Sequence, residues 1–161
     1  SLTKTFTIRP ETMASAVITG CKAKYSYTGK QVKPLIQVVW NGKILGNNTD
    51  YTLLYKNNKK RGSAGIVVTG KGNYSGTLTA SFTIVRASVK KASVNGLKAV
   101  YARTGKAVKP KVTVKLGGKK LKKKRDYILS YRKNKKKGTA LLYVKGVGNY
   151  SGTKKMKFKI R

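Results

Sequence analysis

The sequence predicts an all-β protein made of two tandem β-sandwich domains, and three observations lead to this prediction. The first is an internal repeat, in which GKGNYSGTLTASFTI, from Gly70 to Ile84, recurs as GVGNYSGTKKMKFKI from Gly146 to Ile160. The second is a series of short segments with period-2 hydrophobicity, separated by turn signals about every 8–12 residues, which is typical of β-sandwich proteins. The third is that no window of about eleven residues carries a helical stripe.

The repeat has a constant spacing. Phe6, Phe82 and Phe158 lie 76 residues apart, and at this offset residues 25–85 align without a gap with residues 101–161, with 30 of 61 positions identical. Because the start of the chain matches the end of a copy, we expect a piece cut from a longer array. The predicted parts are the last strand of a preceding repeat at 1–9, a first domain at 10–86 and a second domain at 87–161. Without its own repeat, the leading strand could lie loose, dock on this chain or pair with another molecule.

Each copy is predicted to open with a short apolar strand, at residues 16–18 and at residues 92–94, which ends before a glycine. A Tyr-x-x-Thr-Gly-Lys turn follows at residues 25–30 and 101–106, and leads into Val-Lys-Pro. Because proline cannot donate to a sheet ladder, the next strand is expected to start at an edge or a bend.

The later strands of each copy alternate between inward apolar and outward residues. Asn41-Gly42 and Gly117-Gly118 predict tight two-residue hairpin turns with positive φ at both central residues. The predicted inward residues of the first copy, each with its counterpart 76 positions later, are Ile36, Val38, Trp40, Tyr51, Leu53, Tyr55, Ala64, Ile66, Val68, Phe82 and Ile84.

Six further residues are predicted to shape turns. Asp50 and Asp126 occupy the same position in the two copies, each beside an inward tyrosine, where a side-chain oxygen can cap a turn. The repeated Gly-Asn-Tyr-Ser-Gly motif contributes the others, which are Asn73, Tyr74, Asn149 and Tyr150. We expect these two tyrosines to pack on their own turns, with sugar binding as the alternative.

The motifs YTGKAVKPKVTV, GKKL, RDYILSY, KNKKKGTALLYVKGVGNYSGT and FKI run from Tyr101 to Ile160, with Ala102-Arg103 inserted before Thr104. They resemble the bacterial immunoglobulin-like repeat found in tandem in large secreted surface proteins of Gram-positive bacteria, and the resemblance covers residues 14–161. It implies two immunoglobulin-like β-sandwich domains, an extracellular location at the cell surface or cell wall, and a stalk or spacer role, but no ligand. The chain departs from the repeat at residues 123–127, where Lys-Lys-Arg-Asp-Tyr replaces the usual Gly-Thr-Asp-Tyr.

The composition argues against catalysis. The chain has no histidine, one cysteine, and three carboxylates at Glu11, Asp50 and Asp126, so we predict no catalytic residue, no cofactor and no metal site. Cys21 aligns with Leu97, which favours a small apolar filler over a thiol with an external partner, and a single cysteine excludes an intrachain disulfide. No apolar run approaches the roughly 20 residues that span a bilayer, so membrane insertion is not expected.

One covalent alternative is a crosslink between a buried lysine and an asparagine or aspartate, as in some Gram-positive surface domains. Several lysines and asparagines recur in both copies, but none of these lysines interrupts an apolar strand face. We therefore do not expect the crosslink.

Charge is the most unusual property of the chain. Residues 1–86 carry 13 basic and two acidic residues, whereas residues 87–161 carry 25 basic and one acidic residue, a net charge of +24. Such a surface attracts polyanions, and the attraction weakens as salt is added. Twelve residues of the second copy are candidates for polyanion binding: Lys111, Lys115, Lys122, Lys123, Lys124, Arg125, Lys135, Lys136, Lys137, Lys155, Lys157 and Lys159.

The favoured function is a non-catalytic extracellular spacer whose cationic face adheres to an anionic polymer, either teichoic acid or another wall polymer, or an acidic glycan. Neighbouring repeats of the same chain are the other expected partners. One alternative is a solvated stalk whose lysines only prevent pairing between strand edges. Others are a carbohydrate-binding accessory module of a secreted glycan-degrading protein and a non-specific nucleic-acid binder. Nucleic acid is disfavoured, because the sequence shows no aromatic platform for stacking bases.

Overall fold

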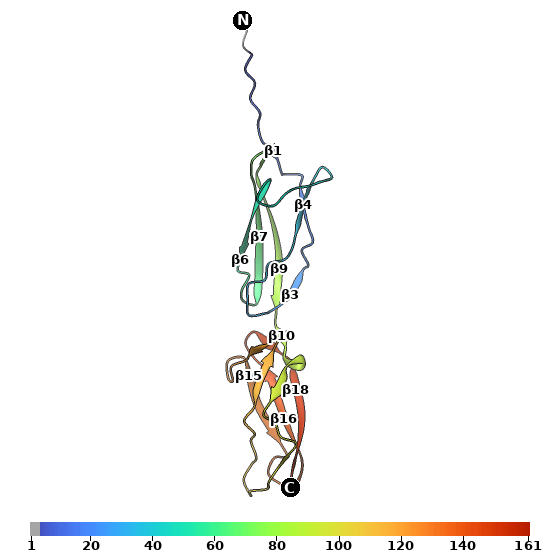
Figure 1. The fold of residues 1–161 in the computed structure, drawn as a ribbon, viewed down its shortest axis with the longest axis vertical. Helices are drawn as coiled ribbons and strands as arrows, with labels where there is room; N and C mark the ends of the chain where they lie inside the picture. Colours follow the sequence, from blue (N-terminus) through green and yellow to red (C-terminus); the bar gives the residue numbers. More distant parts are fainter. Residues whose placement is uncertain (1–3) are drawn as a thin grey trace. The chain divides into compact units, whose positions relative to one another are not determined.

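The computed structural model describes residues 4–161, and over this range the protein is all-β (Figure 1). The chain divides into two compact units. Unit 1 comprises Gly29–Val85 and the described residues up to Tyr25, and unit 2 comprises Ser26–Thr28 and Arg86–Arg161. The described residues contain no α-helix, only a 3₁₀ turn, η1, at Val89–Lys91, and none of their helices has the length and apolarity to cross a membrane.

The strands of unit 1 form three sheets. The smallest pairs β1 with β8 in parallel, the second has the order β2-β4-β5, and the third has the order β3-β9-β7-β6. Their bounds are Glu11–Thr12 (β1), Val17–Thr19 (β2), Lys24–Ser26 (β3), Gln37–Trp40 (β4), Lys43–Ile44 (β5), Tyr51–Lys56 (β6), Gly62–Gly70 (β7), Tyr74–Ser75 (β8) and Thr77–Val85 (β9).

Unit 2 repeats this arrangement. Strand β10 pairs with β17 in parallel, the three-stranded sheet has the order β11-β13-β14, and the four-stranded sheet has the order β12-β18-β16-β15. The bounds are Ala87–Ser88 (β10), Ser93–Asn95 (β11), Val100–Tyr101 (β12), Thr113–Leu116 (β13), Lys119–Lys120 (β14), Tyr127–Arg132 (β15), Gly138–Gly146 (β16), Tyr150–Ser151 (β17) and Thr153–Ile160 (β18).

Alternation of side chains along the strands builds the core of each unit, as the sequence predicts. In unit 2, one apolar cluster combines Val114 of the three-stranded sheet with Leu142 and Phe158 of the four-stranded sheet. Phe158 packs edge-on against Tyr101 at 5.4 Å between ring centroids, and Phe82 of unit 1 packs on Tyr25 in the same way at 5.3 Å. The two cores therefore have equivalent centres.

The hairpin turns confirm the predicted backbone. Asn41 and Gly42 have φ values of 45° and 77°, and Gly117 and Gly118 have values of 55° and 75°. The 3₁₀ turn η1 was not predicted. In this turn the Lys90 backbone N–H donates to the Ser88 hydroxyl at 3.3 Å. Serine makes such local hydrogen bonds in many kinds of turn, so its presence does not predict a 3₁₀ turn.

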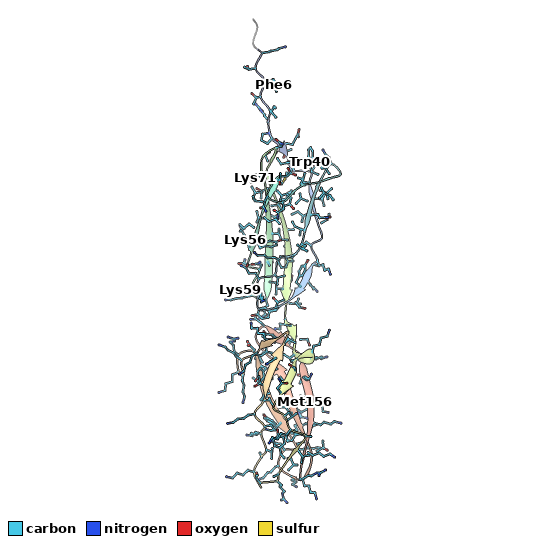
Figure 2. All side chains as sticks on the ribbon, in the orientation of Figure 1. Phe6, Trp40, Lys56, Lys59, Lys71 and Met156 are labelled. Atoms are coloured by element: carbon cyan, nitrogen blue, oxygen red, sulfur yellow. The ribbon has the colours of Figure 1, made fainter. Side chains whose placement is uncertain are left out.

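The predicted leading strand at 1–9 belongs to no sheet of the described residues. Residues 4–10 have no regular secondary structure, and Phe6 and Ile8 are 85% and 80% exposed. Figure 2 shows Phe6 on this segment, away from the strands of unit 1. Residues 1–3 of the predicted strand lie outside the described residues.

Candidate functional site

The two predicted aspartates lie in equivalent turns. Asp50 Oδ2 accepts a hydrogen bond from the Gly46 N–H at 2.8 Å, and Asp126 Oδ2 accepts one from the Lys122 N–H at 2.8 Å. In both units the carboxylate therefore closes the loop that precedes the inward tyrosine, which is a structural role.

The Gly-Asn-Tyr-Ser-Gly turns lie against these aspartate turns. The Lys71 N–H donates to the Asp50 carbonyl at 2.8 Å, and the Val147 N–H donates to the Asp126 carbonyl at 3.0 Å. Tyr74 is 7% exposed and Tyr150 is 3% exposed, so neither offers a free ring to a sugar. The Asn73 carbonyl accepts from the Glu11 N–H and the Asn149 carbonyl accepts from the Ala87 N–H. The recurring motifs thus form the scaffold that joins the loops of each unit.

The glycine that ends the long central strand, Gly70 or Gly146, is part of this scaffold. A Cβ atom at Gly70 would lie 2.8 Å from the Tyr74 carbonyl oxygen, and one at Gly146 would lie 2.7 Å from the Ser151 nitrogen. Since backbone atoms cannot move aside without disrupting the turn, only glycine fits at either position.

Arg125 differs from the other eleven candidate residues because it already has a partner. Its Nε and Nη2 atoms donate to the two carboxylate oxygens of Asp126 at 2.9 Å and 2.8 Å. Hydrogen bonding from Arg125 lowers the pKa of the Asp126 carboxyl below its usual range, opposed by desolvation and assisted by the Lys122 N–H. Arg125 therefore stabilises the turn, and two of its N–H groups are already used in the pair with Asp126 and are not available to a ligand.

All twelve candidate residues are exposed, but they do not form one cluster. Lys135, Lys136 and Lys137 have basic counterparts in Lys59, Lys60 and Arg61 of unit 1, so they do not distinguish the units. The other nine replace uncharged residues, and three of these, Lys155, Lys157 and Lys159, lie in one row on β18.

The row on β18 belongs to a larger cationic sheet face, defined here as the outward side chains of β15, β16 and β18. The register places Lys155 opposite Tyr143, Lys157 opposite Leu141 and Lys159 opposite Thr139 on β16. It also places Ser130 of β15 opposite Tyr143 and Arg132 opposite Leu141. The whole face consists of Ile128, Ser130, Arg132, Thr139, Leu141, Tyr143, Lys145, Thr153, Lys155, Lys157 and Lys159.

The same face of unit 1 is nearly uncharged. Thr79, Ser81 and Thr83 stand in place of the lysine row, and Thr69 stands in place of Lys145. Lys56, on the counterpart of β15 (Figure 2), is its single cation. The face of unit 2 has five. Inward residues change far less between the units, so the charge has been added without altering the core.

Three residues of this face that bear on binding, Tyr143, Arg132 and Lys145, are not among the twelve candidates. Tyr143 is half-buried at the middle of β16, and the Arg132 guanidinium carbon lies 5.7 Å from the centre of its ring, a cation–π contact. Their counterparts are Val67 and Lys56. The signal was present in the sequence, because an outward position of a central strand changes from valine to tyrosine while a lysine becomes arginine.

A second cationic feature is an open groove of unit 2 with a volume of about 850 Å³. Tyr127, Leu129 and Tyr131 of β15 lie at its apolar surface. The Tyr131 hydroxyl is not free, since it donates to the Pro110 carbonyl at 2.8 Å. The five lysines that line the groove are Lys109, Lys111, Lys120, Lys122 and Lys123.

Two lysines of unit 2 have a left-handed backbone that suits asparagine better. Lys124 has a φ of 70° and Lys133 a φ of 55°, while Asn48 and Asn57, at the same positions of unit 1, have φ values of 68° and 54°. Asparagine enters this region more readily than other residues with a side chain. Unit 2 therefore carries lysine at two positions where the left-handed backbone favours asparagine.

The described residues hold no group of three or more histidine, cysteine, aspartate or glutamate side chains that could bind a metal ion. Cys21 is a free, partly buried thiol. The side-chain amide of Asn58 donates to the Val32 carbonyl at 3.0 Å, and that of Asn134 donates to the Val108 carbonyl at 2.9 Å. The recurring asparagines therefore have a structural role of their own.

Comparisons with protein-family models, with curated proteins and with solved structures found no match to this chain.

Proposed function

We propose that the protein is a non-catalytic extracellular spacer of two immunoglobulin-like β-sandwich domains, in which unit 2 adheres to an anionic polymer. Three features support the sandwich: two larger sheets in each unit, a shared apolar cluster in unit 2 and regular inward-outward alternation. The resemblance to bacterial immunoglobulin-like repeats supports a place at the surface or wall of a Gram-positive cell.

The observation that carries the adhesive role is where unit 2 adds its charge. Lysines replace neutral residues at exposed positions, while the core keeps its character. Some of the added charge is unfavourable for folding: Lys115 lies directly opposite Lys120, where unit 1 pairs Val39 with Ile44, and like charges in this arrangement destabilise a sheet. Solubility alone would not favour lysines at such positions, whereas binding to a polyanion would.

The experiment is a binding assay on the full chain with heparin, teichoic acid and duplex DNA as immobilised polyanions, at 50 and 200 mM salt. If about five cations pair with the polymer, affinity should fall roughly a hundredfold or more between these salt concentrations, because binding releases about 0.7–0.9 counterions for each ion pair. An affinity that does not change with salt, or no binding at about 150 mM salt, would contradict electrostatic adhesion. The remaining interpretation would be a stalk with a solvated surface. The ranking of the three polymers would identify the class of partner.

A further inference from the structure

We propose that the cationic sheet face of unit 2 is a specific binding site for an acidic polysaccharide, and that Arg132 and Tyr143 together recognise it. This inference rests on the proposed function and names the ligand class and the site within unit 2. The occupant is a chain of sugar rings that carry carboxylate or sulfate groups.

Charge complementarity is the first argument. The face carries Arg132, Lys145, Lys155, Lys157 and Lys159, and no acidic side chain. The chain has only three acids; Glu11 and Asp50 belong to unit 1, and Asp126 is buried and paired with Arg125. Nothing on the face therefore neutralises its five cations, and an anionic ligand would meet all of them.

The cations flank an apolar strip, with the lysine row on one side and Arg132 on the other. Leu141 and Tyr143 lie on β16 between the lysine row of β18 and the outward residues of β15. A sugar ring presents a face of C–H groups that packs on such a strip, while its acidic substituents reach the flanking cations. A polyol phosphate has no ring, and so gains nothing from Leu141 and Tyr143.

The Arg132–Tyr143 contact gives the third argument, because it positions a guanidinium on an open surface. The cation–π contact at 5.7 Å holds the Arg132 head group over the tyrosine ring, which lowers the entropy that arginine loses on pairing. A guanidinium binds carboxylate or sulfate with two parallel hydrogen bonds, which an ammonium cannot do. Unit 1 has neither part of the pair, with Lys56 and Val67 in their places.

The geometry of the row suits an extended ligand. Alternate residues of a strand are about 6.6–6.8 Å apart, so three lysines on β18 cover about 13–14 Å, the length of a short oligosaccharide. Single-stranded nucleic acid needs an aromatic ring for each of several successive bases, and among the outward residues of β15, β16 and β18 the one aromatic side chain is Tyr143. These features favour an acidic glycan over nucleic acid.

The test uses a charge-conserving double variant of the full chain, Arg132→Lys with Tyr143→Val, which gives unit 2 the residues that unit 1 has at the same register. The probes are a heparin octasaccharide, inorganic polyphosphate and single-stranded DNA. The variant should bind the octasaccharide about tenfold more weakly, the size of one good cation–π and stacking contribution. Its affinity for ring-free polyphosphate should fall less, by about two- to threefold, because polyphosphate loses the bidentate contact of Arg132 but no ring packing on Tyr143.

Two triple variants remove equal charge from different places and complete the test. Lys155→Thr, Lys157→Ser and Lys159→Thr remove the row on the face, whereas Lys122→Gly, Lys123→Asn and Lys124→Asn remove three charges from the loop before Asp126. We expect the row variant to weaken octasaccharide binding at least tenfold more than the loop variant. Thermal unfolding checks that each variant is folded, and Arg132→Lys alone is the milder substitute for the double variant.

Several outcomes would overturn the proposal. They are an equal loss of octasaccharide and polyphosphate affinity in the double variant, no loss of either, equal effects of the two triple variants, or tighter Tyr143-dependent binding of single-stranded DNA. Each would leave general polyanion adhesion standing. If no probe binds the wild-type chain at 50 mM salt, the proposed function fails as well.

Discussion

Units 1 and 2 share one fold but have different surfaces. Their hairpins have the same register, with Gly62 opposite Ile84 and Gly138 opposite Ile160, and Phe82 and Phe158 are both 2% exposed. Their outward residues differ so much that β6, β7 and β9 of unit 1 carry a single cation on this face, whereas β15, β16 and β18 of unit 2 carry five. The comparison teaches that the core fixes the scaffold, and that the outward positions can take a new role without altering it.

Substitutions in the two equivalent cores should have the largest effect on the free energy of unfolding. Phe82→Ala and Phe158→Ala should each lower the free energy of unfolding by about 3–5 kcal/mol, since each removes a fully buried ring and leaves a cavity. Urea unfolding of each variant measures the two losses. A difference of more than about 1.5 kcal/mol between them would show that the cores are not equivalent.

The left-handed positions allow a reciprocal exchange between the units. Lys124→Asn with Lys133→Asn should stabilise unit 2 by about 0.5–1 kcal/mol at each site, because asparagine is less strained at positive φ than lysine. Asn48→Lys with Asn57→Lys should destabilise unit 1 by a similar amount. Denaturant midpoints of the two double variants measure the exchange, and shifts of the same sign in both would contradict the backbone argument.

The opposed lysines of the three-stranded sheet provide a smaller contrast. Replacing Lys115 by Val and Lys120 by Ile gives unit 2 the cross-strand pair of unit 1, and should stabilise it by about 0.2–1 kcal/mol at low salt. Part of the gain should disappear in about 1 M salt, where the Debye length is near 3 Å. Thermal unfolding at both salt concentrations gives the answer. A gain that is independent of salt would mean that burial, and not charge, is responsible.

The smallest expected effect concerns acid stability, because the Arg125 side chain is 58% exposed and solvent screens its ion pair. The folded-state pKa of Asp126 is lowered, chiefly by Arg125, so its contribution to stability is present above the unfolded pKa of about 3.9 and is lost as the pH falls through the folded pKa. Arg125→Thr, which introduces the residue of unit 1, should raise the pKa of Asp126 and reduce this acid-dependent loss. Unfolding temperatures between pH 2 and pH 5 test this, and an unchanged pH profile would contradict it.

Much of the fold could be predicted from the sequence because the chain repeats itself. Alternation identified Val38, Ile66 and Phe82 as inward residues, and all three are buried. Local turn chemistry identified the positive-φ hairpins. The partners of each strand could not be predicted, since hydrophobic period gives the face of a strand but not its neighbour in the sheet. The parallel pairing of β12 with β18 is one such contact.

The candidate site could be predicted only in part. The row on β18 was evident from its period of two, and the structure adds the residues beside it. Tyr143 and Arg132 lie eleven positions apart in the chain, on neighbouring strands, and only the register of β15 against β16 brings them together. The Arg125–Asp126 pair was missed for another reason, because adjacent residues of opposite charge do not by themselves predict a bidentate ion pair.

The central claim is that the added charge of unit 2 is an adhesive surface. The most direct measurement is the slope of log affinity against log salt for the full chain on heparin, compared with the Lys155→Thr, Lys157→Ser, Lys159→Thr variant. If the three lysines pair with the polymer, the slope should become shallower by about two, at roughly 0.7 for each lost ion pair. A slope that stays the same would show that the row does not contact the polymer, and would contradict the claim.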